Sequence, residues 1–210
     1  MHKQRTNDGV GFQEVLEKME NKDIAKLVDN ILSDIPQKFW EVPSSSTGKY
    51  HPPENNEDGG LIKHTLKLVQ VAAELMRFFE DKSEGEKSSN KISVKGEDNP
   101  YLLDHFIAAG ILHDAYKYGL DWEKKYTTRE HASDSAKIVK IASRQERTPD
   151  IDPDDIEKIC KLVECHMSRW SYPDPAPAKN KAELLIQLAD YIAARKTISF
   201  TLPGWIVDLG

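Results

Sequence analysis

The sequence predicts an all-α protein: a helical bundle with a helical arm at its N-terminus and a long loop before the main bundle. Two observations lead to this fold class. Apolar residues recur at helical spacing in nearly every segment, and no segment shows the sustained alternation of apolar and polar residues that marks a half-buried strand. With 39% hydrophobic and 30% charged residues in 210, the chain can bury one core and stay soluble.

The first expected element is a helix or helix pair that stops at Pro36, since apolar residues from Phe12 to Leu32 follow helical spacing. Residues 1–35 are therefore predicted to form an arm that packs on a domain of residues 36–210. Residues 36–60 are rich in proline, serine and glycine, which predicts a long loop. Loops of this length in compact domains are often functional.

The rest of the chain predicts five helices and one insertion. Residues 81–99 are polar and low in complexity, which is typical of a mobile surface segment. Pro100 can open the helix that follows this insertion, because proline is tolerated in a first helical turn. The expected helices cover about residues 61–80, 100–113, 130–145, 153–168 and 181–199.

Composition excludes some classes of protein and disfavours others. The longest apolar runs are far shorter than a membrane span and the first residues are not signal-like, so a cytoplasmic protein without membrane contact is expected. The formal net charge of −6 argues against a broad nucleic-acid grip, although a few local cations could still hold a small phosphorylated substrate. Cys160 and Cys165 are expected to be small core thiols.

Several polar residues lie on inward faces of the expected helices. His64, for example, shares one helical face with Leu61, Leu68 and Val71. Asp190 lies in the middle of an apolar run, where a bare carboxylate would be costly to bury. One such residue is usually structural, but six together are not accidental: His64, His113, Asp114, His131, His166 and Asp190.

Together these six residues predict a metal centre. Imidazole nitrogen and carboxylate oxygen are the ligand set of Zn, Mn, Fe, Co and Ni sites. One or two divalent transition-metal ions are therefore expected, with Mg also possible. The ligands suit several cations, so the identity of the metal stays open.

The order of these residues resembles the HD superfamily of metal-dependent phosphohydrolases. The pattern of that superfamily is a histidine, an adjacent His-Asp pair and a distant aspartate. His64 in GGLIKHT, His113 and Asp114 in GILHDAYK, and Asp190 in LADYIAA match it. The resemblance covers about residues 36–200 and implies the helical bundle of an HD domain.

Members that bind two metals carry two more histidines between the pair and the last aspartate, and His131 and His166 occupy those places. The resemblance implies that Asp114 bridges the two ions and acts in catalysis. The common HDIGK form of the family departs here to HDAYK: Lys117 is kept, but Tyr116 replaces glycine.

The segment FWEVPSSSTGKYHPPENNEDGGLIKHT is similar to the entry loop of the bacterial 3′→5′ exoribonuclease branch of the superfamily. Those enzymes carry an additional oligonucleotide-binding domain, for which this chain is too short. The Gly-Tyr-Pro signature of the cyclic-dinucleotide phosphodiesterases is missing. The likeness therefore implies kinship of the catalytic domain and not a shared substrate.

The resemblance implies hydrolysis of a phosphoester of a nucleotide, or of a similar small phosphorylated substrate, by a metal-activated water. The acidic net charge favours a small substrate, whereas the entry loop favours a 3′→5′ exonuclease or phosphodiesterase acting on short oligonucleotides. A sensor that binds a nucleotide without turnover, or a structural metal site, is the non-catalytic alternative. The oligomeric state stays open, because the apolar C-terminal segment could pack on its own domain or on a neighbour.

The remaining candidates concern the substrate. The resemblance favours Lys117 as a second catalytic residue that neutralises a phosphate oxygen, although an ordinary lysine is a solvated surface residue. Arg169 and Trp170 follow a ligand at a helix end, where arginine could bind phosphate and tryptophan could stack on a base. A purely structural Arg-Trp stack is an equal alternative. Lys49 and His51 in the serine-rich loop are weaker candidates for substrate contact.

Overall fold

The computed structural model describes residues 11–45, 51–79, 90–95, 100–170, 176–196 and 198, apart from the side chains of Glu54 and Arg169. The described part of the chain is mostly helical, which confirms the predicted all-α class. None of its helices is both long enough and apolar enough to cross a membrane.

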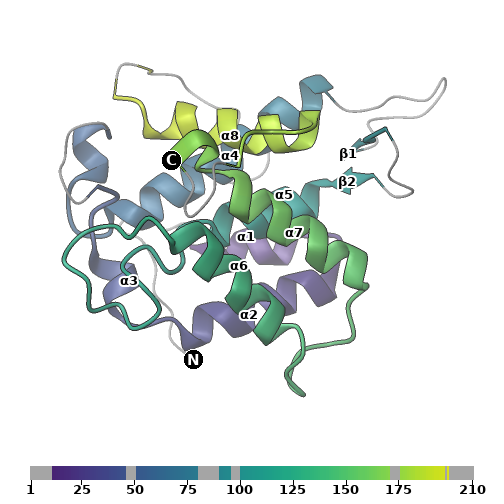
Figure 1. Ribbon diagram of the computed structural model, residues 1–210, viewed down its shortest axis with the longest axis horizontal. Coiled ribbons are helices and arrows are strands. Elements are labelled where there is room, and N and C mark those ends of the chain that lie inside the picture. The colour runs from purple at the N-terminus through teal and green to yellow at the C-terminus, as the bar shows by residue number, and fades with distance from the viewer. Residues whose placement is uncertain are drawn as a thin grey trace.

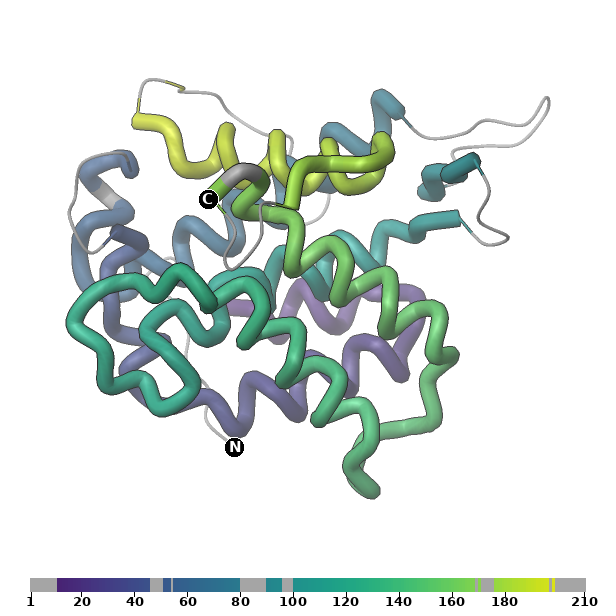
Figure 2. The backbone as a smooth tube through the Cα atoms, in the orientation of Figure 1, coloured from purple at the N-terminus to yellow at the C-terminus, as the bar shows by residue number. Residues whose placement is uncertain are grey.

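Within residues 11–45, three helices precede the main bundle: α1 (Phe12–Lys18), α2 (Lys22–Asp34) and the single turn α3 (Lys38–Glu41). The Asn21 side chain caps α2 by accepting two backbone N–H groups from its first turn. Asp104 of the main bundle in turn accepts the backbone N–H of Asn21, which ties the start of α2 to the bundle. Figure 2 shows α2 running beside α6, although the two are far apart in sequence.

The main bundle has five longer helices. Helices α4 and α8 lie side by side along one edge of the molecule, α5 packs between α4 and α7, and α6 packs on α7 (Figure 1). Their apolar faces join those of α1 and α2 in one buried cluster. These helices are α4 (Gly60–Phe79), α5 (Leu103–Leu112), α6 (His131–Ala142), α7 (Pro153–Cys165) and α8 (Lys181–Ala194).

A short hairpin was not predicted. Strands β1 (Lys91–Ile92) and β2 (Tyr101–Leu102) pair antiparallel, so α5 begins at Leu103 and the predicted helix start at Pro100 is wrong. Ile92 lies within the expected surface insertion, but its side chain is fully buried. Strands of two residues are too short to show an alternating pattern, and only their pairing in space defines them.

Helices α4 and α5 approach each other closely at Gly110. A β-carbon at Gly110 of α5 would lie 2.9 Å from a methyl carbon of Val69 and 3.0 Å from one of Leu68. Glycine therefore lets α5 lie directly on α4. This contact sets the distance between the two helices that carry His64 and His113.

His105 is a core residue and not part of the candidate site. Its ring is fully buried, with Nδ1 accepting the backbone N–H of Leu102 and Nε2 lying 2.9 Å from a carboxylate oxygen of Asp155. Both ring nitrogens are therefore used to join β2 and α5 to the first turn of α7.

Candidate metal centre

Two glycines place His64 at the start of α4. Gly59 has a φ of +73°, a conformation that side chains disfavour, and a β-carbon on Gly60 would lie 2.1 Å from the carbonyl oxygen of Asn55. The same carbonyl accepts the backbone N–H and the hydroxyl of Ser44. The described part of the entry loop is thus folded tightly against the start of α4, and His64 is buried one turn later.

The other five predicted ligands come from helix ends and from α8. His113 and Asp114 directly follow α5, His131 is the first residue of α6, and His166 directly follows α7. The ends of three helices therefore meet at one point, where polar side chains can turn inward without interrupting an apolar helical face. Asp190 comes from the interior of α8.

Backbone carbonyls fix the orientation of three imidazole rings. The Nδ1 atoms of His113, His131 and His166 each lie within hydrogen-bond distance of the carbonyl oxygen three residues earlier in the chain. A carbonyl can only accept, so each Nδ1 carries the proton and each Nε2 is left with a lone pair. The three distances are 2.7 Å to Gly110, 2.6 Å to Thr128 and 2.6 Å to Val163.

These lone pairs face one another and a carboxylate. The Nε2 atoms of His131 and His166 are 3.2 Å apart, and Asp114 Oδ1 lies 3.1 Å from His131 Nε2. His113 Nε2 is buried, lies 3.3 Å from Asp114 Oδ2 and has no hydrogen-bond partner among the described residues. Three imidazole lone pairs and a carboxylate so close together are unfavourable unless a cation lies between them. The donor set therefore fits divalent metal ions.

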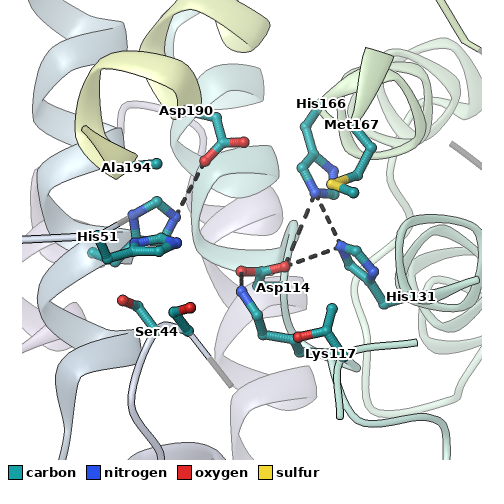
Figure 3. A pocket seen from close by; sticks show the side chains of 12 residues that line it. Ser44, His51, Asp114, Lys117, His131, His166, Met167, Asp190 and Ala194 are labelled. Atoms are coloured by element: carbon teal, nitrogen blue, oxygen red, sulfur yellow. Dashed lines mark hydrogen bonds and ion pairs between the residues drawn. The ribbon is translucent and has the colours of Figure 1, made fainter. Parts of the chain in front are cut away.

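Asp114 lies at the centre of the cluster, between His131 and His166 on one side and His51 and Asp190 on the other (Figure 3). Among the described residues, two groups of side chains have ligand atoms close enough to hold an ion, and Asp114 belongs to both. The first group is His64, His113 and Asp114, and the second is Asp114, His131 and His166.

Asp190 joins the site through His64. Its Oδ1 atom lies 3.2 Å from His64 Nε2. The sequence suggested a carboxylate buried in an apolar run, but the Asp190 side chain is 21% exposed because it faces a cavity and not the core. Burial would raise the pKa of this carboxyl, yet the hydrogen bond from His64 outweighs burial and the pKa is lowered.

The ammonium of Lys117 contacts Asp114 Oδ2 one turn further along the chain, and both side chains are buried. Burial alone would raise the pKa of Asp114, but Lys117 and His113 outweigh burial and hold the pKa well below its usual range. Burial would lower the pKa of His113, and the Asp114 carboxylate raises it instead. The carboxylate is thus kept ionised inside the protein, as a metal ligand must be.

Other histidines of the site are held neutral. Burial, together with the neighbouring His113 and His131, lowers the pKa of His166 to about 3. Burial likewise lowers the pKa of His64, and burial together with His64 and Lys117 lowers that of His51 to about 3. Neutral imidazole is the form that binds metals.

A cavity of about 350 Å³ opens onto this cluster. It brings together five of the six predicted ligands, Lys117 and the predicted substrate contact His51, while His113 lies just behind its wall. The residues that line it are Ser44, Ser45, His51, His64, Asp114, Lys117, Thr127, His131, His166, Met167, Asp190 and Ala194.

Five of these lining residues were not predicted. The serine-rich loop drew attention to its segment, but no pattern selected Ser44 and Ser45 within it, and Thr127 lies in a stretch without periodicity. Met167 follows a ligand directly, and Ala194 lies four residues after Asp190, so helical spacing from a ligand could have found Ala194.

Three predicted substrate contacts are not placed in the cavity. Trp170, in a short 3₁₀ turn (Ser168–Trp170), is 67% exposed and is not one of the described residues that line the cavity. Lys49 and the Arg169 side chain lie outside the described part of the structure. Their contact with a substrate stays a prediction.

Comparison with protein families identifies the domain that holds this site. The family model of the HD domain matches residues 61–195, which is more than half of the chain and includes all six predicted ligands. No curated protein and no solved structure matches the chain.

Proposed function

We propose that this chain, which belongs to the HD domain family, hydrolyses the phosphoester of a small phosphorylated substrate, with a nucleotide as the first candidate. HD domains are generally metal-dependent hydrolases, so the class of enzyme follows from the family. The substrate and the residue roles are the part that we propose.

One observation carries the proposal: two histidine groups share the carboxylate of Asp114 at the wall of a cavity. Oδ2 of Asp114 lies toward His113 and Oδ1 toward His131, so each oxygen serves one group. Divalent ions held there would lower the pKa of a bound water and neutralise phosphate charge. A purely structural metal would not need a shared carboxylate that opens onto a cavity.

Side chains of the cavity fit a phosphate group. Lys117 supplies a positive charge next to the shared carboxylate, and Ser45 and Thr127 bring hydroxyl groups to the wall. We propose that Lys117 neutralises a non-bridging phosphate oxygen while the hydroxyls orient the group. His51, whose ring lies 4.9 Å from that of His64, would contact the substrate from the entry loop.

The size of the cavity favours a small substrate over an oligonucleotide. About 350 Å³ lies at the lower end of the range of small-molecule sites. The net charge of −6 also disfavours a long polyanion bound along the surface. The terminal nucleotide of a short oligonucleotide could still enter, so 3′→5′ exonuclease activity is the alternative that the test must separate.

The test is product release from a panel of substrates by protein that was first stripped of metal. The panel holds nucleoside mono- and triphosphates, cyclic nucleotides and short oligonucleotides, and Mn, Co, Ni, Zn and Mg are added back one at a time. Metal-dependent release of phosphate from a mononucleotide supports the proposal. Release of mononucleotides from oligonucleotides alone would replace it with the exonuclease.

The panel also separates an enzyme from a sensor. Nucleotide binding without turnover, with metal bound in stoichiometric amount, would overturn the hydrolase and support a sensor. A chain that binds metal but neither binds nor hydrolyses any phosphate compound would support a structural site.

A further inference from the structure

The loop between α5 and α6 contains a backbone outlier. Trp122 has a φ of +58°, a conformation that side chains other than glycine rarely adopt. Its bulky side chain is almost completely buried. A conformation of this kind persists only where its surroundings fix it, and it is often found beside a functional site.

Contacts from two directions fix Trp122. Its indole N–H donates to the carbonyl of Ala115 at 3.1 Å, inside the same loop. From α3, the Lys38 ammonium donates to the Trp122 carbonyl at 2.9 Å, and the Phe39 ring meets the indole edge to face at 5.9 Å. Lys38 also lies 5.2 Å from the centre of the Tyr118 ring.

This loop forms one wall of the cavity. Lys117 and Thr127 both line the cavity, and the backbone N–H of Thr128 donates to the Lys117 carbonyl at 2.9 Å. Ala115, which contacts Trp122, and Tyr118, which contacts Lys38, both lie within two residues of Lys117. A shift of Trp122 would therefore move the backbone that carries the Lys117 ammonium.

We infer that Lys38 is a positioning residue, which fixes the phosphate-binding Lys117 through Trp122 and Tyr118. Lys38 lies outside residues 61–195, the part matched by the family model, so a helical turn that precedes the matched part completes a site that the family domain supplies only in part. The inference rests on the proposed function, because it takes Lys117 as the residue that binds phosphate.

The test is the affinity of the Mn²⁺-loaded protein for inorganic phosphate, measured by calorimetry. Lys38 is exposed, so Lys38→Met should fold normally while losing the charged donor. We expect it to weaken phosphate binding about 3- to 10-fold without changing Mn²⁺ affinity or the unfolding temperature. Lys38→Arg should bind phosphate as tightly as the native protein. Lys26→Met, which replaces an exposed lysine whose ion pair lies within α2, should leave phosphate affinity unchanged.

A double-mutant cycle separates positioning from a general structural role. If Lys38 acts through Lys117, the variant with both Lys38→Met and Lys117→Ala binds phosphate no more weakly than Lys117→Ala alone. Additive losses of phosphate affinity would overturn the inference while leaving the proposed function intact. The same holds if Lys38→Met binds phosphate as tightly as the Lys26→Met control. Unchanged phosphate affinity in Lys117→Ala would overturn both the positioning and the phosphate role of Lys117.

Discussion

Asp114 is the residue on which both histidine groups depend, because each of its carboxylate oxygens faces one group. Asp114→Asn keeps the shape of the side chain but removes its charge. We expect metal-dependent hydrolysis to fall at least about 100-fold, since a neutral amide cannot bridge two cations in the same way. Asp29→Asn, on the exposed face of α2, is the matched control. Equal turnover in the two variants, both with native circular dichroism, would contradict a central role for Asp114.

The neutral histidines predict how the stability of the metal-free protein depends on pH. His166 has a pKa of about 3 when folded and 6.5 as an ordinary histidine, so below pH 6.5 only the unfolded chain takes up this proton. The free energy of unfolding should therefore fall toward acid by up to about 1.4 kcal/mol per pH unit for this group. His51 and His64, whose pKa values are also lowered, act in the same direction.

Chemical denaturation between pH 4 and pH 8, in the presence of a chelator, measures this slope. His166→Gln removes the group and should flatten the acid limb by about one proton. The raised pKa of His113 has the opposite effect on stability. Its stabilisation is present below pH 6.5 and is lost as the pH rises through the pKa of the folded state. An acid limb that is unchanged in His166→Gln would show that this residue is not buried in its neutral form.

At the scale of single residues, the sequence identified site residues where a polar side chain interrupted an apolar pattern. His64 and His113 were found because a polar side chain interrupted an apolar helical face, which is costly without a partner. Ser45 and Thr127 also line the cavity, but they lie in loops, where no periodicity exists to be interrupted. Only the folded chain brings such residues to the site.

At the scale of elements, the start of α4 depends on Gly60. In Gly60→Ala the new β-carbon would lie 2.1 Å from a backbone carbonyl of the entry loop, so either the loop or the helix must move. We expect a loss of more than about 3 kcal/mol in unfolding free energy. Metal affinity should also fall, because His64 lies only one turn after Gly60 in this helix.

Gly110→Ala is the matched comparison, measured by the same denaturation experiment. Its new β-carbon would meet only the ends of two side chains, at 2.9 and 3.0 Å, and alanine is favoured over glycine inside a helix by about 1 kcal/mol. The net loss should therefore be smaller than in Gly60→Ala. A larger loss at Gly110 would mean that the α4–α5 contact, and not the entry loop, controls the site.

The longer helices were predictable, but not all of their ends were. The helix expected at about residues 61–80 is α4 at Gly60–Phe79, because a pair of glycines marks its start and its apolar spacing is regular. The helix expected to reach about residue 199 ends at Ala194. The hairpin and the single turn α3 escaped prediction because each is too short to show a period, and α3 carries the Lys38 and Phe39 contacts of the further inference.

At the scale of the whole molecule, the candidate ligands join α4, α8 and the ends of α5, α6 and α7. A cation bound there links elements that the unfolded chain would leave apart. Binding to the folded state alone stabilises a protein by about 2.7 kcal/mol at a hundred times the dissociation constant. Metal should therefore raise the unfolding temperature of this protein independently of any activity.

The number of bound ions follows from the shared carboxylate. Because Asp114 belongs to two groups of ligands, we expect two ions per chain, measured by calorimetry together with elemental analysis. His131→Gln removes a ligand from one group only and should leave one ion bound. His64→Gln should do the same for the other group, so each variant keeps part of the thermal stabilisation.

The two variants also test whether the groups are independent. If both ions bind Asp114, losing one should weaken the other, because the carboxylate could then turn back to Lys117. The native protein could instead bind one ion, which is lost in His64→Gln and kept in His131→Gln. That result would assign a single site to His64, His113 and Asp114. The second histidine pair would then be free to contact the phosphate.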